Sequence, residues 1–430
     1  MVEVYQHVLV VGGARDLPAR LRRIAPGTRT SVICRSSFLP RMQQADEHVR
    51  VIALGPDASE AEWVRWARAV HARDPFTAVA AYGERDQDHC AAIGRALTLP
   101  AHTPATVTLV YHKEAMRRRL REAGVDPTAS ARVVDLAEAR RFVAAHGLPC
   151  IVKPVTGAGS SGVALVSHDS ELEPALVRAA GGVEGLPDAG VLMEQYHRGR
   201  ELSVEAFSHR GDHQVVAVTA KYTDPVTFVE LGHVVPAPIG REDAEALHAL
   251  VPRVLDALGV TFGPTHTEVV LTAQGPRVIE THIRLAGDDI PLLVHSATGV
   301  DLVDCTVRQT LGEDVLPGLR RRLAGTPTGT SAAVWFASTR ERGVLRSVAG
   351  VPDAEAVPGV EAVRILAAPG ALCGGLDSSY ARIASVRASA PTPQQAVATA
   401  RAAAASLDLR VDPEPATPAG GTPALATTAG

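Results

Sequence analysis

The 430-residue sequence is poor in several residue types, and each scarcity excludes a class of protein. Aromatic residues make up only 4% of the chain, too few for the stacking platforms that bind single-stranded nucleic acids. The 43 basic and 47 acidic residues give a net charge of −4, so bulk attraction to nucleic acid or to an anionic membrane is not expected. No apolar run reaches the ~18 residues that span a membrane.

Cysteine is also scarce. The five cysteines are scattered, odd in number and lack metal-binding spacing, which is typical of reduced thiols in a cytoplasm. The first residues lack the basic region and the small-residue cleavage site of a secretory leader. The sequence therefore predicts a cytoplasmic protein with no membrane or nucleic-acid partner.

Lysine is the rarest charged residue. Of the 43 basic residues only three are lysine, namely Lys113, Lys153 and Lys221. A GC-rich coding bias toward arginine explains this scarcity, and it leaves lysine mainly where a planar guanidinium cannot replace a compact ammonium group. We therefore expect the three lysines to mark places where a point charge is required.

The hydrophobic pattern predicts an α/β (α+β composite) fold. Residues 1–105 alternate apolar strands with amphipathic helices, which indicates a small doubly wound, Rossmann-like domain. Residues 106–192 contain a basic helix and a strand–glycine loop–strand unit, which we treat as a small subdomain. Residues 193–410 form a large domain that includes a smaller subdomain at 331–410. Residues 411–430 are rich in Pro, Gly, Ala and Thr and are predicted to be a disordered tail.

A glycine loop at residues 157–162 (GAGSSG) matches the spacing GxGxxG. The loop precedes the strand-like VALV rather than a helix, so a hairpin is favoured over a dinucleotide-binding turn. The backbone N–H groups of such a loop can enclose phosphates, and Lys153 on the preceding strand could reach them. The alternative is a flexible β-turn beside an exposed lysine.

Residues 265–284 (THTEVVLTAQGPRVIETHIR) predict a β-hairpin that carries two glutamates. On a hairpin centred on Gln274, Glu268 and Glu280 face each other. Directly opposed like charges destabilise a hairpin, and a divalent cation between them removes that cost. Mg²⁺ is suited to such a place because it takes one or two carboxylates together with substrate phosphates. The alternatives are a solvated face with Arg–Glu pairs, or a zinc site.

Three ordered motifs together resemble the ATP-grasp superfamily: IVKPVTGAGSSGVALV, MEQYHRGRELSVEAF and HTEVVL…RVIETHIRLAGD. The likeness is strong over 105–300, and the stretch AKYTDPVTFVELGHVVPAPI at 220–239 is similar to bacilysin-synthetase-type L-amino acid ligases. The resemblance implies an ATP-grasp fold with an N-terminal pre-ATP-grasp domain, a linker helix and small lid subdomain at 106–192, and a C-terminal subdomain. It also implies a carboxylate–amine ligase that uses ATP and Mg²⁺, forms an acyl phosphate and gives a dipeptide or amide, in natural-product biosynthesis and as a homodimer.

The resemblance also implies roles for individual residues. The residues expected to hold the ATP phosphates are Lys113, Lys153, Gly157, Gly159, Ser160, Ser161 and Gly162. The residues expected to hold adenine and ribose are Glu194, Gln195, Tyr196 and Glu201. The residues expected at the metal are Glu268, Glu280 and His282. The residues expected to act in the chemistry are Arg284, at the tetrahedral intermediate, Gly287, as a backbone donor, and Lys221, as a cation on the phosphate or substrate side.

His282 departs from the family, which usually has an asparagine two residues after the second metal glutamate. A neutral imidazole can bind a metal, but it is softer and bulkier than an amide oxygen. His282 is therefore a metal ligand, a group that orients the site or contacts substrate, or a sign of Mn²⁺ preference or of a weakened second metal. Two other functions stay open: an ATP-grasp carboxylase or purine-pathway ligase, and a non-catalytic nucleotide sensor. Specificity is expected from distant segments that include Glu230 and His233.

Overall fold

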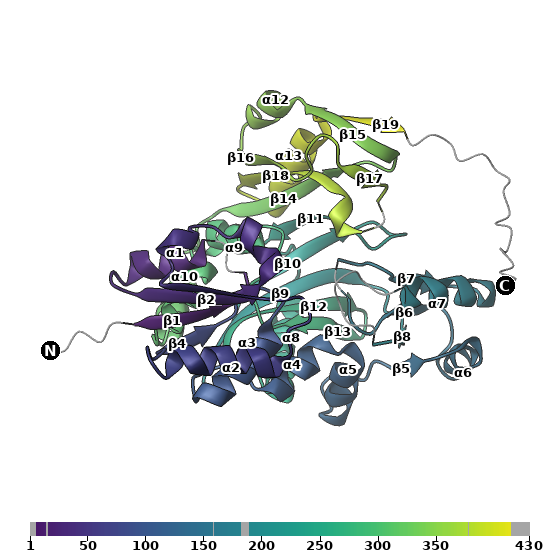
Figure 1. The fold of residues 1–430 in the computed structure, drawn as a ribbon. Helices are drawn as coiled ribbons and strands as arrows, with labels where there is room; N and C mark the ends of the chain where they lie inside the picture. Colours follow the sequence, from purple (N-terminus) through teal and green to yellow (C-terminus); the bar gives the residue numbers. More distant parts are fainter. Residues whose placement is uncertain (1–5, 14–15, 158, 182–188, 377, 414–430) are drawn as a thin grey trace, which may run out of the picture.

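The computed structural model describes residues 6–13, 16–157, 159–181, 189–376 and 378–413. These residues form four β-sheets with helices packed against them, as the α/β composition predicts. In Figure 1 the N-terminal sheet lies at the left, a small antiparallel sheet at the right, and the C-terminal strands at the top. The largest sheet connects these parts through the middle of the molecule.

The N-terminal unit is a four-stranded parallel sheet in the order β3-β2-β1-β4. Its strands are β1 (His7–Val11), β2 (Arg29–Arg35), β3 (Arg50–Leu54) and β4 (Ala78–Ala80). Its helices are α1 (Leu17–Ile24), α2 (Glu60–His71) and α3 (Gln87–Leu97), with short 3₁₀ turns η1 (Ser36–Arg41) and η2 (Ala45–Glu47). β1 is buried along its whole length, which is typical of a central parallel strand covered on both faces. The alternation predicted for this region is confirmed.

A lid unit follows, which we define as the sheet β5-β8-β6-β7 with its two helices. The chain reaches it through α4 (Pro104–Tyr111) and the basic helix α5 (Lys113–Glu122). The lid contains β5 (Ser130–Val133), α6 (Leu136–His146), β6 (Cys150–Pro154), β7 (Ala164–Val166), η3 (Asp169–Glu171), α7 (Leu172–Ala180) and β8 (Val191–Gln195). β6 and β7 pair antiparallel on either side of the glycine loop, so the predicted hairpin is confirmed.

The central sheet has eight strands in the order β13-β12-β9-β10-β11-β14-β18-β16. Its first five strands are β9 (Arg200–His209), β10 (Asp212–Thr223), β11 (Glu230–Val235), β12 (Phe262–Thr272) and β13 (Gly275–His282). The helices of this part are α8 (Arg241–Leu258), α9 (Ile290–Thr298), α10 (Leu302–Thr310) and α11 (Leu316–Ala324). Valine, leucine and alanine side chains from β9, β10, β12 and α8 form the largest buried cluster.

The C-terminal unit continues the central sheet, because β14 (Ser331–Ser338) pairs with β11. The unit also contains β15 (Arg342–Ala349), α12 (Val351–Glu355), β16 (Val360–Ile365), β17 (Leu372–Gly374), η4 (Ser379–Ala381), β18 (Arg382–Ala390), α13 (Pro393–Ala405) and β19 (Asp408–Pro413). β17, β15 and β19 form a separate three-stranded sheet. The boundary predicted at residue 410 falls inside β19, and the rest of the predicted tail, 414–430, lies outside the described residues.

The β12–β13 hairpin has the predicted pairing of Glu268 with Glu280, but a different turn produces it. Thr272 pairs with Gly275, so the hairpin is centred half a residue earlier than the Gln274 expected from symmetry. A β-bulge between Glu268 and Val269 shifts the register and restores the opposition of the two glutamates. Bulges re-aim side chains in this way beside functional sites.

Two buried polar side chains hold the bulged part of β13 in place. The Val278 N–H donates to Asp126 Oδ2 at 2.7 Å, and Arg117 donates to the carbonyls of Val278 and Ile279. Asp126 and Arg117 are 2% and 3% exposed, so water cannot take over these hydrogen bonds. The register that opposes the two glutamates therefore depends on groups from outside the hairpin.

Among the described residues, no single helix is long and apolar enough to cross a membrane. The bent pair α9 and α10, which meet at 104°, passes a test of length and composition when the two are taken together.

Replacing Asp126 by Ala removes the acceptor for the Val278 N–H and leaves that donor buried. A buried unsatisfied donor costs about 1–3 kcal/mol, so we expect a lower midpoint of thermal unfolding, measured by calorimetry. Asp126→Asn keeps an acceptor oxygen and should lose less stability. An unchanged midpoint in Asp126→Ala would show that the bulge does not need this hydrogen bond.

Candidate active site

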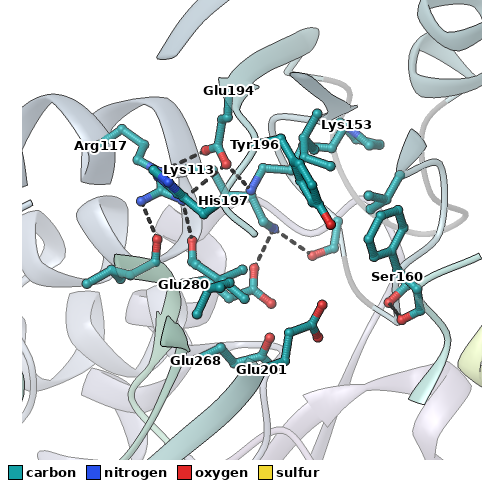
Figure 2. A pocket seen from close by; sticks show the side chains of 18 of the residues that line it. Lys113, Arg117, Lys153, Ser160, Glu194, Tyr196, His197, Glu201, Glu268 and Glu280 are labelled. Carbon is teal, nitrogen blue, oxygen red and sulfur yellow. Dashed lines mark hydrogen bonds and ion pairs between the residues drawn. The ribbon is translucent and has the colours of Figure 1, made fainter. Parts of the chain in front are cut away.

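A cavity of about 160 Å³ lies between the lid unit and the β12–β13 end of the central sheet (Figure 2). It receives side chains from the helix α5, the glycine loop, the end of β8 and the central strands. The predicted residues that line it are Lys113, Lys153, Gly157, Gly159, Ser160, Ser161, Glu194, Gln195, Tyr196, Glu201, Lys221, Glu268 and Glu280. Gly162, His282, Arg284 and Gly287 are not among the lining residues. The structure therefore gathers most of the predicted nucleotide and metal residues around one space.

The two opposed glutamates are each paired with a lysine. Lys113 Nζ lies 3.0 Å from Glu280 Oε2, and Lys221 Nζ lies 2.7 Å from Glu268 Oε1. Burial would raise the pKa of Glu280 and of Glu268, but the lysines lower both, that of Glu268 to about 2. Both carboxylates are therefore ionised at neutral pH, as a cation site requires.

Lys153 is held by a different carboxylate. Its Nζ lies 2.7 Å from Glu194 Oε2, and Glu194 also accepts hydrogen bonds from Arg117 at 2.8 and 3.1 Å. Burial would raise the pKa of Glu194, but Arg117 and Lys153 lower it to about 2. Burial lowers the pKa of Lys153, and Arg117 and Lys113 lower it further because they are cations close by. Because Arg117 and Lys153 bind the Glu194 carboxylate from both sides, this carboxylate orients Lys153.

Among the described residues, none forms a hydrogen bond or ion pair with the Glu201 carboxylate, which points into the cavity (Figure 2). Burial raises its pKa to about 6; Lys221 opposes this shift, and Glu268 and Glu230 add to it. A buried carboxylate without a partner is costly, and two vicinal hydroxyl groups would satisfy both of its oxygens. This environment fits the ribose role predicted for Glu201.

The glycine loop is built to approach a ligand closely. Gly159 and Gly162 have φ of +65° and +76°, a region that glycine adopts without strain, and a Cβ on Gly162 would lie 3.0 Å from Pro154. The loop also touches the rest of the molecule: Ser160 Oγ donates to the Phe228 carbonyl at 3.0 Å, and the Ser379 N–H donates to the Gly159 carbonyl at 3.2 Å. The hairpin therefore covers the cavity and rests on the central sheet and the C-terminal unit.

Behind the glutamates, two histidines extend the polar network. His266 Nε2 lies 3.3 Å from Glu268, and His266 Nδ1 lies 3.0 Å from Glu205. His282 Nε2 lies 3.2 Å from Glu280, and its Nδ1 lies 3.2 Å from Glu84 of the N-terminal unit. Burial would lower the pKa of His266, but Glu205 and Glu268 raise it to about 9.

Arg284 and Gly287 lie beyond the end of β13, next to the cavity rather than in its wall. The Arg284 guanidinium forms an ion pair with Glu84 and donates to the Leu285 carbonyl at 2.8 Å. The Gly287 carbonyl accepts from the Ile290 N–H at 3.0 Å, at the start of α9. Arg284 therefore lies where the N-terminal unit meets the central sheet, Gly287 lies at the start of α9, and Lys221 lines the cavity itself.

A second cluster of charges lies on the other side of Lys221. Glu230 Oε1 lies 3.1 Å from Lys221 Nζ, and Arg382 of β18 bridges Glu230 and Asp288 at 2.6 and 2.8 Å. His233 Nε2 lies 3.0 Å from Asp288. Glu230 and His233, expected to contribute to specificity, are thus brought together with Asp288 and Arg382.

The residues present fit a divalent cation. The ligand atoms of Glu268, Glu280 and His282 all lie within 4.8 Å of one another. Two ionised carboxylates offer the hard oxygen ligands that Mg²⁺ and Mn²⁺ prefer. Magnesium suits this donor set better than zinc, since a structural zinc site would need four closed protein ligands.

Sequence reasoning missed several residues of this network: Arg117, Glu84, Glu205, His266, Asp288 and Arg382. His266 carried a usable signal, because it precedes Glu268 by two residues on the same strand face. Arg117 was hidden among abundant arginines in a basic helix. Glu84 had no local signal, because the contact it makes with Arg284 spans 200 residues.

Comparison with known proteins agrees with this geometry. The pattern of the ATP-grasp domain matches residues 146–291, and that of the L-amino acid ligase C-terminal domain 2 matches residues 335–412. The chain therefore contains an ATP-grasp domain over residues 146–291. Its fold also superposes on the crystal structure of an L-amino acid ligase from Bacillus licheniformis, with a TM-score of 0.79 at 20% identity over 95% of this chain and 99% of that one.

Several relatives of this ATP-grasp protein align over part of their length. The uncharacterized protein y4rH of Sinorhizobium fredii is 32% identical over 324 residues, 75% of this chain and 65% of the relative. The formate-dependent phosphoribosylglycinamide formyltransferase of Burkholderia cenocepacia is 29% identical over 63% of this chain and 65% of that protein. Alanine–anticapsin ligase of Bacillus subtilis is 24% identical over 44% of each chain. The chain thus spans about two thirds or less of the length of these relatives.

Nucleotide affinity should depend on the ionisation of Glu201. Below its pKa of about 6 the carboxyl is protonated and loses its charge-assisted hydrogen bonds, so ADP should bind more weakly at pH 5.5 than at pH 7.5. Glu201→Gln should bind ADP about tenfold more weakly at pH 7.5, for a loss of about 1.5 kcal/mol. Calorimetric titration of both proteins across this range provides the test. The ratio of the two affinities cancels the titration of ADP itself, and a ratio that stays constant with pH would contradict the prediction.

Proposed function

We propose that the protein is an ATP-dependent carboxylate–amine ligase that joins an amino acid, or a similar carboxylate, to an amine and gives a dipeptide or amide with ADP and phosphate. The observation that carries this proposal is the pair of opposed, ionised glutamates facing a glycine hairpin and two lysines across one cavity. Mg²⁺ or Mn²⁺ held by Glu268 and Glu280 would supply Lewis-acid stabilisation of the transferring phosphoryl group. The likeness to L-amino acid ligases supports amino acids as substrates.

Different groups of the chain bind different parts of the nucleotide. Glu201 accepts hydrogen bonds from the ribose hydroxyls, and the backbone of Gln195 and Tyr196 contacts the edge of the adenine ring. Lys113 and Lys153 neutralise phosphate oxygens, while the N–H groups of the glycine loop enclose them from the lid side. Phosphoryl transfer depends mainly on such positioning and charge neutralisation, which explains why no nucleophilic side chain is needed.

The reaction then proceeds in two steps. The carboxylate substrate attacks the γ-phosphate and becomes an acyl phosphate, and ADP leaves. The amine attacks the acyl carbon, and the Arg284 guanidinium stabilises the oxyanion of the tetrahedral intermediate before phosphate leaves. The ion pair with Glu84 fixes the direction in which Arg284 points. A ligase of this kind is consistent with a role in natural-product assembly.

The cluster on the far side of Lys221 supports a zwitterionic substrate. Glu230 and Asp288 are acceptors for an ammonium group, and Arg382 holds both in place. Burial would raise the pKa of Asp288, but His233 and Arg382 lower it to about 2, so it is anionic. An amino acid fits this arrangement better than formate, which has no ammonium group, although the formyltransferase relatives keep a purine-type ligase as the second candidate.

The test is a phosphate-release assay with ATP and Mg²⁺ against amino acids, singly and in pairs, and against formate, with hydroxylamine as a trap. A hydroxamate that forms from one amino acid would establish the acyl phosphate and name the first substrate. Formyl hydroxamate would favour the purine-type ligase instead. ADP binding with no phosphate release from any carboxylate would favour a nucleotide sensor.

Glu280→Gln should remove one of the two metal carboxylates while keeping the shape of the side chain. The loss of several kcal/mol of transition-state stabilisation predicts that the rate of ADP formation falls by about 10²- to 10³-fold or more. A coupled enzyme assay measures this rate. Glu245→Gln, on the exposed side of α8, serves as the control and should be unaffected. Near-normal turnover in Glu280→Gln would overturn the metal assignment.

A further inference from the structure

Two parallel rows of side chains run behind the metal glutamates. The first row is Glu268, His266 and Glu205, and the second is Glu280, His282 and Glu84. The rows lie side by side, since His266 pairs with His282 in the strand register just as Glu268 pairs with Glu280. The two imidazole rings are 5.9 Å apart with an angle of 25° between their planes.

Each histidine has a carboxylate on both sides. In the first row the two nitrogen–oxygen distances are 3.3 and 3.0 Å, and in the second both are 3.2 Å. In both rows the imidazole lies between a glutamate of the β12–β13 hairpin and a second carboxylate, so it is placed to fix the position of that glutamate.

The rows are anchored in different parts of the protein. Glu205 lies in the middle of β9, is 1% exposed, and also accepts a hydrogen bond from Ser203 Oγ at 2.8 Å. Glu84 belongs to the N-terminal unit and is held at the same time by Arg284. The first row thus links Glu268 to the middle of the central sheet, and the second row links Glu280 to the N-terminal unit.

We propose that His266 and His282 are positioning residues, and that Glu205 and Glu84 orient their rings so that Glu268 and Glu280 are both held in place for the cation. The proposal rests on the proposed function, because it assumes that Glu268 and Glu280 bind the metal of a metal–nucleotide complex. Hydrogen-bond partners of this kind, one step removed from a metal, typically change metal affinity by about 10- to 100-fold when they are lost.

The positioning role of the two rows can be tested without turnover. Electron paramagnetic resonance measures the affinity of the ADP-saturated protein for Mn²⁺. Glu205→Gln keeps the size of the side chain and touches neither the metal nor the nucleotide. We expect Mn²⁺ affinity to fall about 10- to 100-fold in Glu205→Gln, in His266→Gln and in Glu84→Gln. ADP affinity measured in EDTA should stay unchanged in Glu205→Gln and His266→Gln, because the residues proposed to hold adenine and ribose are untouched.

A matched control removes a histidine–carboxylate pair elsewhere on the same sheet. His213 contacts Asp256 at 3.3 Å from the end of β10 opposite to Lys221. His213→Gln should therefore bind Mn²⁺ as the wild type does. A fall in Mn²⁺ affinity as large as that of Glu205→Gln would show a general loss of structure and overturn the assignment of specific positioning.

The spin-echo spectrum of bound Mn²⁺ separates positioning from ligation. A directly coordinated imidazole gives a strong ¹⁴N coupling, and we expect none in the wild type. A ¹⁴N coupling that disappears in His282→Gln would overturn the proposal and make His282 a ligand. Wild-type protein that binds no Mn²⁺ with ADP would contradict the proposed function itself. If the wild type binds Mn²⁺ with ADP and Glu205→Gln binds it with equal affinity, the positioning role of the two rows is contradicted and the proposed function is not.

Discussion

The opposition of Glu268 and Glu280 across the β12–β13 hairpin is the constraint on which the rest of the site depends. Two ionised carboxylates that face each other inside a protein repel strongly, because the interior screens charge poorly. The chain relieves this repulsion with a lysine in front of each glutamate and a histidine behind it. The lysines come from the helix α5 and the strand β10, so side chains from elements far apart in the sequence meet at the hairpin.

These contacts also explain why lysine persists at three positions in an arginine-rich chain. Lys153 and Lys221 are buried and Lys113 is half-buried, and each ammonium group lies within hydrogen-bond distance of a carboxylate. A guanidinium is larger and planar, and it keeps its charge under all conditions. Arginine appears instead where a fork can bind two acceptors at once, as Arg117 does with Glu194 and Arg382 with Glu230 and Asp288.

The sequence was sufficient to predict the parts of the site that lie on one strand or one loop. The glycine hairpin follows from local patterns of period two and from turn residues, whereas the pairing of Glu268 with Glu280, predicted on a symmetric turn, arises from a shifted turn and a bulge. The β-bulge was not predictable, because it is held by Asp126 and Arg117 from outside the hairpin. Glu84 escaped for the same reason, since only the folded chain brings the N-terminal unit to Arg284.

The pairing of β11 with β14 has a consequence for how this chain could be divided or recombined. Because the C-terminal strands extend the central sheet through the β11–β14 pairing, a cut between α11 and β14 would leave an unpaired sheet edge on each of the two fragments. Arg382 belongs to this C-terminal portion and donates a hydrogen bond to Glu230 of β11. Exchanging this portion between homologues therefore exchanges Arg382 and its contacts with Glu230 and Asp288, the cluster proposed to bind the substrate.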